Sequence, residues 1–246
     1  MGISGDGSLS SKGVELQTPK LRGQNGENLV RKITRLLNDR DFRVDRSCGL
    51  HVHIDGVDLS PRTRTKHNPQ TIKNLLMLYI TYEDVIQSIL PRSRRNNRYA
   101  QHVRNNFHCA EIEQCNSLES IEKLWYRVAK RKDLKYQKDQ HYNSTRYNGL
   151  NLHSLFSDGH LEIRYHSGTI NAEKILHWCQ LHLAMVDYAK RSGYIQSQPE
   201  MTALGEKTEH LFNILSLPDA TREYYRNRQN TFSSNLNTEE SENRNH

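Results

Sequence analysis

The stretch C-G-L-H-V-H-I-D at residues 48–55 decides the fold, because its side chains alternate strictly between apolar and polar. The two sets are Leu50, Val52 and Ile54 against His51, His53 and Asp55. Successive side chains of a β-strand point to opposite faces, so the alternation predicts a strand with one face on a core. Two imidazoles two residues apart bring their ring nitrogens near one point, which suits a metal ion or a phosphate. Taken alone, the pair fits two solvated or hydrogen-bonded histidines equally well.

Three further segments repeat the alternation and predict more strands. They are residues 13–17 (GVELQ), 147–155 (YNGLNLHSL) and 160–166 (HLEIRYH), with Asp158-Gly159 as a hairpin turn between the last two. Apolar residues at helical spacing predict helices at residues 26–39, 69–90, 117–128, 172–190, 202–215 and 219–228. The pattern predicts an α+β fold in which a mainly antiparallel sheet has helices packed behind its apolar face.

The composition favours anionic partners without choosing among them. The chain has 246 residues, a formal net charge of +7, a pI near 9.2 and a mean hydropathy of −0.86. Its four cysteines form no C-x-x-C pair, so we expect free thiols. His108, Cys109 and Cys115 supply three zinc ligands, but no fourth follows at the usual spacing. No run reaches the roughly 18 apolar residues that a membrane span needs, and a secretory signal is missing, so we expect a cytoplasmic protein.

The polar face of the predicted sheet carries unusual side chains. They are Glu15; His51 and His53; Asn151 and His153; and Glu162 and Arg164. Two carboxylates and one imidazole suit a divalent cation, and a guanidinium two residues past Glu162 suits a phosphate. The face therefore indicates a metal–nucleotide site. The alternative is an ordinary solvated sheet surface, although such surfaces usually carry Lys, Thr and Ser.

Five motifs in order resemble the putative amidoligase family. They are DGSL…GVELQTP, CGLHVHID, PRSRRNNRY, RYNGLNL and LEIRYHSGT, and they cover the chain from about Gly5 to Lys190. This family belongs to the carboxylate–amine ligase superfamily, with glutamine synthetase and glutamate–cysteine ligase. The resemblance implies an ATP-dependent ligase that joins a small-molecule or peptide carboxylate to an amine through an acyl-phosphate, with Mg²⁺ on the phosphates. It also implies a sheet curved around the site.

The resemblance implies roles for individual residues. It implies metal ligands at Glu15, His51, Glu162 and Asp6; contacts to the nucleotide at Arg164, His51 and Asn151; and catalytic roles at Arg164, Arg146 and His53. Arg94 and Arg95 lie in the family's S-R-R loop, where they either bind a substrate carboxylate or form an exposed basic turn.

One departure from the family bears on activity. Members usually begin with a strand G-x-E-x-E whose two glutamates complete the metal cluster, whereas this chain starts at MGISGDG. We therefore expect one domain over residues 1–228 that lacks this strand, with a disordered polar tail at 229–246. A missing edge strand would expose backbone groups to pairing with another chain, so an oligomer is compatible with the sequence.

Three other functions remain open at this point. A metal-dependent hydrolase would use the H-x-H pair, although the expected strands are too few for a barrel. A nucleic-acid-binding module would use the net charge and the P-R-S-R-R-N-N-R cluster, which lacks interleaved aromatic residues. A truncated, catalytically impaired member would serve as a binding module.

Overall fold

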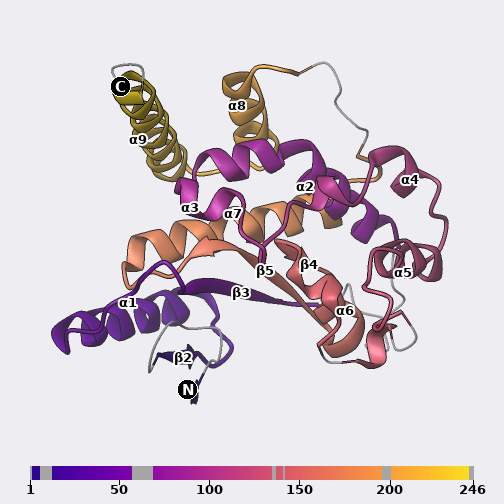
Figure 1. The fold of residues 1–246 in the computed structure, drawn as a ribbon, viewed down its shortest axis with the longest axis horizontal. Coiled ribbons are helices and arrows are strands. Elements are labelled where there is room, and N and C mark those ends of the chain that lie inside the picture. The colour runs from indigo at the N-terminus through magenta and orange to yellow at the C-terminus, as the bar shows by residue number, and fades with distance from the viewer. Residues whose placement is uncertain are drawn as a thin grey trace.

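The structure of the chain, a computed structural model, confirms the α+β class (Figure 1). It describes residues 2–5, 13–56, 69–134, 137–140, 142–195 and 201–243, with side chains as far as residue 233. Two small antiparallel sheets lie among the helices. No helix in the described part of the chain is long and apolar enough to cross a bilayer.

A three-stranded antiparallel sheet carries the alternating segments. Strand β5 (His160–Ser167) lies in the middle, with β3 (Gly49–Asp55) on one side and the two-residue β4 (Leu150–Asn151) on the other. The register places His53 opposite Glu162 and Asn151 also opposite Glu162, each on its own edge of β5. Residues directly opposite in an antiparallel pair point to the same face, so the register alone gathers these three side chains.

The first expected strand lies in a separate sheet. Strand β2 (Val14–Gln17) pairs with β1 (Gly2–Gly5), in which Glu15 lies opposite Ser4. The expectation of four strands sharing one polar face is therefore wrong for β2. Local pairing with β1 satisfies the backbone of β2, and the sequence pattern of a strand does not specify its partner.

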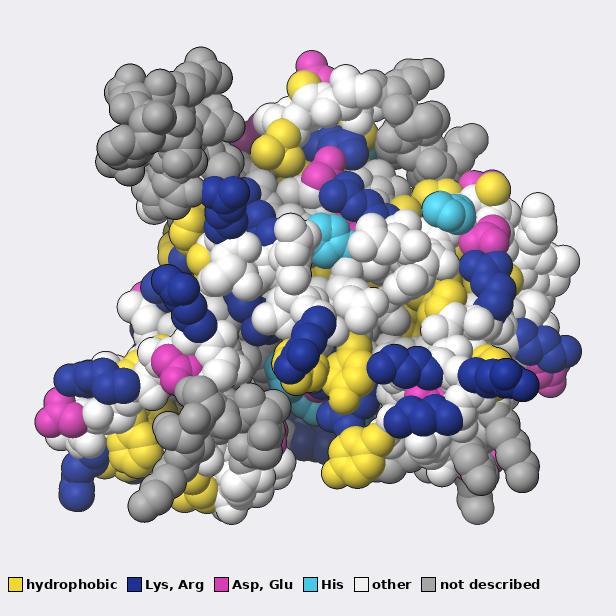
Figure 2. Space-filling view, in the orientation of Figure 1, with side chains coloured by type: hydrophobic (Ala, Val, Ile, Leu, Met, Phe, Trp, Pro, Cys, Tyr) yellow, Lys and Arg dark blue, Asp and Glu magenta, His cyan; other side chains and the backbone are white. Residues whose placement is uncertain are grey.

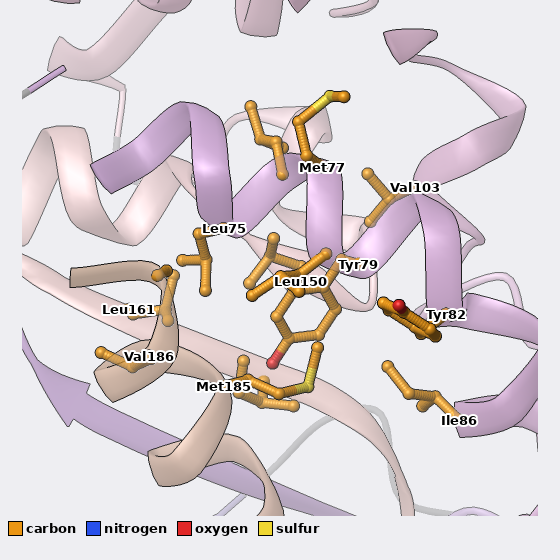
Figure 3. Close-up of a cluster of buried hydrophobic side chains, with 14 of the residues drawn as sticks. Leu75, Met77, Tyr79, Tyr82, Ile86, Val103, Leu150, Leu161, Met185 and Val186 are labelled. Atoms are coloured by element: carbon orange, nitrogen blue, oxygen red, sulfur yellow. The ribbon is translucent and has the colours of Figure 1, made fainter. Parts of the chain in front are cut away.

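Helix α2 (Pro69–Ser88) is the centre of the core and is buried on nearly all sides. Figure 3 shows its Leu75 and Tyr79 in one cluster with residues of β4, β5 and α7 (Ala172–Arg191), among them Leu150, Leu161, Met185 and Val186. The buried Glu83 of α2 accepts from the Tyr165 hydroxyl of β5 at 2.5 Å and from the Val103 amide at 2.7 Å. This carboxylate fixes the helix to the sheet and to η1 (Val103–Asn105).

Most of the other helices occur where the sequence predicts them. They are α1 (Gly23–Asp39), α5 (Leu118–Tyr126, capped by Ser117), α7 and α8 (Leu204–Ile214). The short helices α3 (Arg92–Arg95) and α4 (Cys109–Glu113) are not predicted by the sequence pattern. Two short 3₁₀ helices, η2 (Gln137–Asp139) and η3 (Ser144–Tyr147), precede β4.

Two expectations for local structure differ from what is observed. The segment after β4 forms helix α6 (His153–Asp158), and Gly159 ends that helix at φ 83° instead of forming a hairpin turn. Helix α9 (Asp219–Asn243) continues past residue 228 into the segment expected to be a disordered tail. The first difference arises because a left-handed glycine serves a helix C-terminus as well as a turn.

Candidate functional site

The site is built around Glu162 on the polar face of the three-stranded sheet. We call His51, His53, Asn151, Glu162 and Arg164 the polar cluster. One oxygen of Glu162, Oε1, accepts from Arg164 Nη1 at 2.6 Å, and it lies 3.2 Å from His51 Nδ1 and 3.7 Å from His53 Nε2. The other oxygen accepts from Asn151 Nδ2 at 2.6 Å. The structure thus brings together five of the eight residues to which the family resemblance assigns a role.

Helix α6 orients the Asn151 side chain. The Oδ1 atom accepts from the backbone amide of His153 at 2.9 Å, so the amide nitrogen turns toward Glu162. The ring of His153 is buried and its Nδ1 lies 2.8 Å from the hydroxyl of Tyr126, which takes it away from the cluster. The expected strand position of His153 on the polar face is therefore wrong, because the chain turns into a helix there.

Arg164 is buried and held at two points. Its Nε donates to the carbonyl of Tyr99 at 3.2 Å while Nη1 donates to Glu162. Arg94 donates to the backbone carbonyls of Arg164 and Tyr165, and Arg95 donates to the carbonyls of Leu90 and Ser88. The guanidinium groups of Arg94 and Arg95 therefore hold backbone carbonyls of β5 and of the end of α2, instead of standing in an exposed turn.

The electrostatics of the cluster favour an ionised Glu162. Burial alone would raise the pKa of this carboxyl, but the hydrogen bond from His51 and the charges of Arg164, His51 and His53 outweigh it. The net result is a pKa held far below the usual range for a glutamate. The pKa of His53 is lowered from its usual value, because the partial desolvation of its ring outweighs the attraction of Glu162. A neutral imidazole beside a carboxylate is the form that binds a metal ion.

His51, His53 and Glu162 are the three potential metal ligands that converge in the described part of the chain, with ligand atoms all within 4.8 Å of one another. Ligands about 2.1 Å from one ion lie about 3.0–3.4 Å apart in octahedral or tetrahedral sites, so the 3.2 Å and 3.7 Å separations need little adjustment. The side chain of His53 is 51% exposed, which leaves the cluster open to solvent. Figure 2 shows a hollow in the lower middle of the molecule with histidine and basic side chains inside it.

Of the other three expected site residues, two are outside the polar cluster and the third is not described. Glu15 is exposed on β2 in the separate sheet and is outside the group of potential metal ligands. Arg146 lies on η3, with its guanidinium group 5.0 Å from the ring centre of Tyr142. Among the described residues, Arg146 forms no ion pair with Glu162. Asp6 lies outside the described residues.

Sequence reasoning missed two contributors to the site. The ring of His160 lies 4.7 Å from that of His53, and its position two residues before Glu162 on β5 was a signal for the same face. The carbonyl of Tyr99, which holds Arg164, is a backbone group, so no residue pattern could have found it.

One of the comparisons with known proteins shows the family of the chain. The family described as "putative amidoligase enzyme" matches residues 6–186, which include every member of the polar cluster. The chain therefore belongs to the amidoligase family, whose description indicates an amide-forming, ligase-type function. No curated protein and no solved structure gave a match.

Proposed function

We propose that the chain is an ATP-dependent carboxylate–amine ligase that forms an amide through an acyl-phosphate. The observation that carries the proposal is the gathering of an ionised Glu162, two imidazoles and a buried arginine on one sheet face of an amidoligase family member. Phosphoryl transfer needs positioned positive charge and a divalent cation more than it needs covalent chemistry from the protein.

The residues of the cluster fit a cation–triphosphate complex. His51, His53 and Glu162 would hold the cation, and because Mg²⁺ prefers oxygen ligands, the phosphate oxygens would complete its shell. When bound, the cation would offset the charge on the triphosphate oxygens. Nη2 of Arg164 has no acceptor among the described residues, so it is free to donate to a phosphate oxygen. Asn151 would keep Glu162 oriented toward the histidines.

The remaining expected residues keep a place in the proposal. His53 is the most exposed member of the cluster, and we propose that it contacts the reacting groups. Arg146 would act from η3, on the segment next to β4, and Glu15 and Asp6 would add oxygen ligands from the N-terminal segment. The proposal does not depend on Arg146, Glu15 or Asp6, because none of the three belongs to the polar cluster.

The test measures ADP formation by the purified chain with ATP, Mg²⁺ or Mn²⁺, and a panel of carboxylates and amines. Hydroxylamine traps an acyl-phosphate as a hydroxamate, so it reports the intermediate directly. We expect Glu162→Gln to lower carboxylate-dependent turnover by about a hundredfold or more. Glu209→Gln is the matched control, because Glu209 also pairs with an arginine, Arg226, but on an exposed surface. Turnover that is equal in Glu162→Gln and the wild type would contradict the proposal.

A metal-dependent hydrolase is the second candidate, and one observation favours it. Two histidines and a glutamate are a donor set found in catalytic zinc sites with an open position. Elemental analysis of the purified chain separates the two functions. Stoichiometric zinc together with amide hydrolysis in the absence of ATP would support the hydrolase and exclude the ligase.

A further inference from the structure

A pocket of about 430 Å³ lies next to the polar cluster and plays no part in the chemistry described so far. Its wall includes Arg98, Tyr99, Gln101, Lys130, Ser144 and Tyr147, and we call it the Tyr99–Tyr147 pocket. The volume falls in the range of small-molecule sites, about 300–1,000 Å³.

Backbone hydrogen bonds of Tyr99 and Gln101, two residues of the pocket wall, connect the pocket to the strand of Arg164. The carbonyl of Tyr99 accepts from Arg164 Nε, the arginine that we propose binds phosphate. The backbone of Gly149 donates to the Gln101 carbonyl at 2.8 Å and accepts from the Arg164 amide at 2.7 Å. A ligand in the pocket would therefore contact residues whose backbone also holds Arg164 in place.

The wall is already organised. The rings of Tyr99 and Tyr147 meet edge to face at 5.5 Å, and the amide of Gln101 donates to the Tyr147 carbonyl at 2.7 Å. The side-chain amide of Asn106 donates to the side-chain oxygen of Asn148 at 3.0 Å, so these two residues of the wall bind each other. A preformed pocket loses little conformational entropy when it binds.

The two charged side chains that line the pocket, Arg98 and Lys130, are both hydrogen-bond donors. Arg98 gives one bond to the Tyr99 hydroxyl at 2.7 Å and keeps its other N–H groups, and in the described part of the chain neither Arg98 nor Lys130 pairs with a carboxylate. The Ser144 hydroxyl accepts from the Lys130 amide at 2.8 Å and gives its own proton to the Asp133 carboxylate, so it adds no free donor to the pocket. The carboxylate of Asp133 accepts from the backbone amide of Ser144, but Asp133 does not line the pocket. Two cations with free donors match a ligand that only accepts.

We propose that the Tyr99–Tyr147 pocket binds a free carboxylate of the substrate, so that the ligase acts on an amino acid or peptide that bears a carboxylate besides the one activated. The inference rests on the proposed function for the identity of the ligand. A phosphate group has the same recognition chemistry, and the experiment below separates the two sources.

The experiment follows backbone amide NMR shifts of residues 98–101 and 144–148 in the full chain during titration with N-acetylglycine. N-acetylglycinamide, which lacks the charge, is the ligand control, and inorganic phosphate and ADP are the competing anions. We expect saturable shifts with N-acetylglycine alone, and Arg98→Gln and Lys130→Gln each to weaken its binding by about tenfold. Arg43→Gln is the matched control, because Arg43 is exposed and lies outside the pocket.

Each other outcome overturns the inference. Equal shifts with N-acetylglycinamide, or binding that Arg98→Gln leaves unchanged, would show that the pocket does not recognise a carboxylate. Tighter binding of phosphate or ADP, lost in Arg98→Gln, would assign the pocket to the nucleotide. Because the experiment measures binding, its result is independent of the test of the proposed function. If the chain binds N-acetylglycine in this pocket but does not turn over ATP, the ligase proposal fails and the carboxylate-binding pocket is still supported.

Discussion

The carboxylate of Glu162 is the most heavily used side chain of the cluster. It accepts from Arg164 and Asn151 and lies against His51, and it is buried. Removing its charge leaves Arg164 buried without its counter-ion. Breaking a buried ion pair in this way typically costs about 3–5 kcal/mol. The same residue therefore serves stability and the proposed chemistry, which gives it a characteristic pH dependence.

We predict that Glu162→Gln lowers the free energy of unfolding by about 3 kcal/mol at pH 7 and by less at acid pH. The folded-state pKa of Glu162 is depressed, so its contribution is present above the ordinary carboxyl pKa and declines as pH falls below it. The difference between variant and wild type should narrow by about 1 kcal/mol between pH 7 and 3.5. Urea denaturation at several pH values measures it, with Glu209→Gln as the exposed control. A difference that is constant with pH would show that Glu162 is not held ionised.

Beneath the sheet, two buried histidines form a second titrating unit. His182 of α7 lies 2.5 Å from the Tyr79 hydroxyl and against the Trp178 ring, which in turn contacts His166 of β5. Burial, together with proximity to His166, lowers the pKa of His182 to about 3, and burial lowers the pKa of His166 to about 4. Both histidines remain neutral in the folded chain at pH 5, whereas the unfolded chain protonates them near pH 6.5.

We predict that these histidines destabilise the fold as pH falls from 7 to 5. Each unfolded histidine gains a proton that the folded one does not take, which costs about 2 kcal/mol of unfolding free energy over this interval. Between pH 7 and pH 5, the free energy of unfolding of His182→Phe should fall by about 2 kcal/mol less than that of the wild type. This difference in slope does not depend on how stable the variant is at pH 7. The comparison of slopes by chemical denaturation is the measurement. Parallel slopes for the two proteins would contradict the assignment.

At the scale of the element, close packing of β4 on β5 requires a glycine. A Cβ on Gly149 would lie 2.0 Å from the ring of Tyr165. We predict that Gly149→Ala destabilises the fold by at least about 2 kcal/mol, because the buried ring has nowhere to move. A Cβ added to Gly205 in α8 would meet no atom within 4 Å, so Gly205→Ala should raise the free energy of unfolding by about 0.5 kcal/mol. Thermal unfolding of the two variants tests this, and similar effects of both would exclude the steric argument.

The elements also show which parts of the fold the sequence determines. The period-2 pattern predicts β3 and β5, and the helical spacing predicts α2, α5 and α7. Helix α6 escapes this reasoning, because Leu152, Leu155 and Phe156 fit a helix as well as the alternation of Leu150 and Leu152 fits a strand. Short segments of this kind are decided by tertiary packing.

The same limit applies to the site. His51, His53, Asn151, Glu162 and Arg164 could be predicted to meet, because alternation places them on one face and the register of three adjacent strands brings them together. Glu15 carries the same local signal on β2, but nothing in a four-residue strand states which sheet it joins. The Tyr99 carbonyl and the Tyr99–Tyr147 pocket depend on loop packing, for which the sequence has no periodic pattern.

At the scale of the whole molecule, the folded unit extends past the family match, which ends at residue 186. Helices α8 and α9 and the connection between them bury large side chains in the core around α2, including Leu211, Phe212, Leu215, Leu217 and Tyr225. Arg228 of α9 donates to the Ile89 carbonyl at 3.0 Å, and Gln229 bridges the Ser88 and Thr208 hydroxyls. Figure 1 shows both helices on the side of α2 away from β3.

We predict that a chain ending at residue 200 fails to fold stably, whereas one ending at residue 233 unfolds at the same temperature as the full chain. Each lost apolar side chain contributes about 1.5–3 kcal/mol of burial, so five of them exceed the typical stability of about 5–15 kcal/mol or come close to it. Thermal unfolding and limited proteolysis of the three chains provide the measurement. If the 200-residue chain kept its melting temperature, α8 and α9 would be an appendage, and the core would have to close over α2 without them.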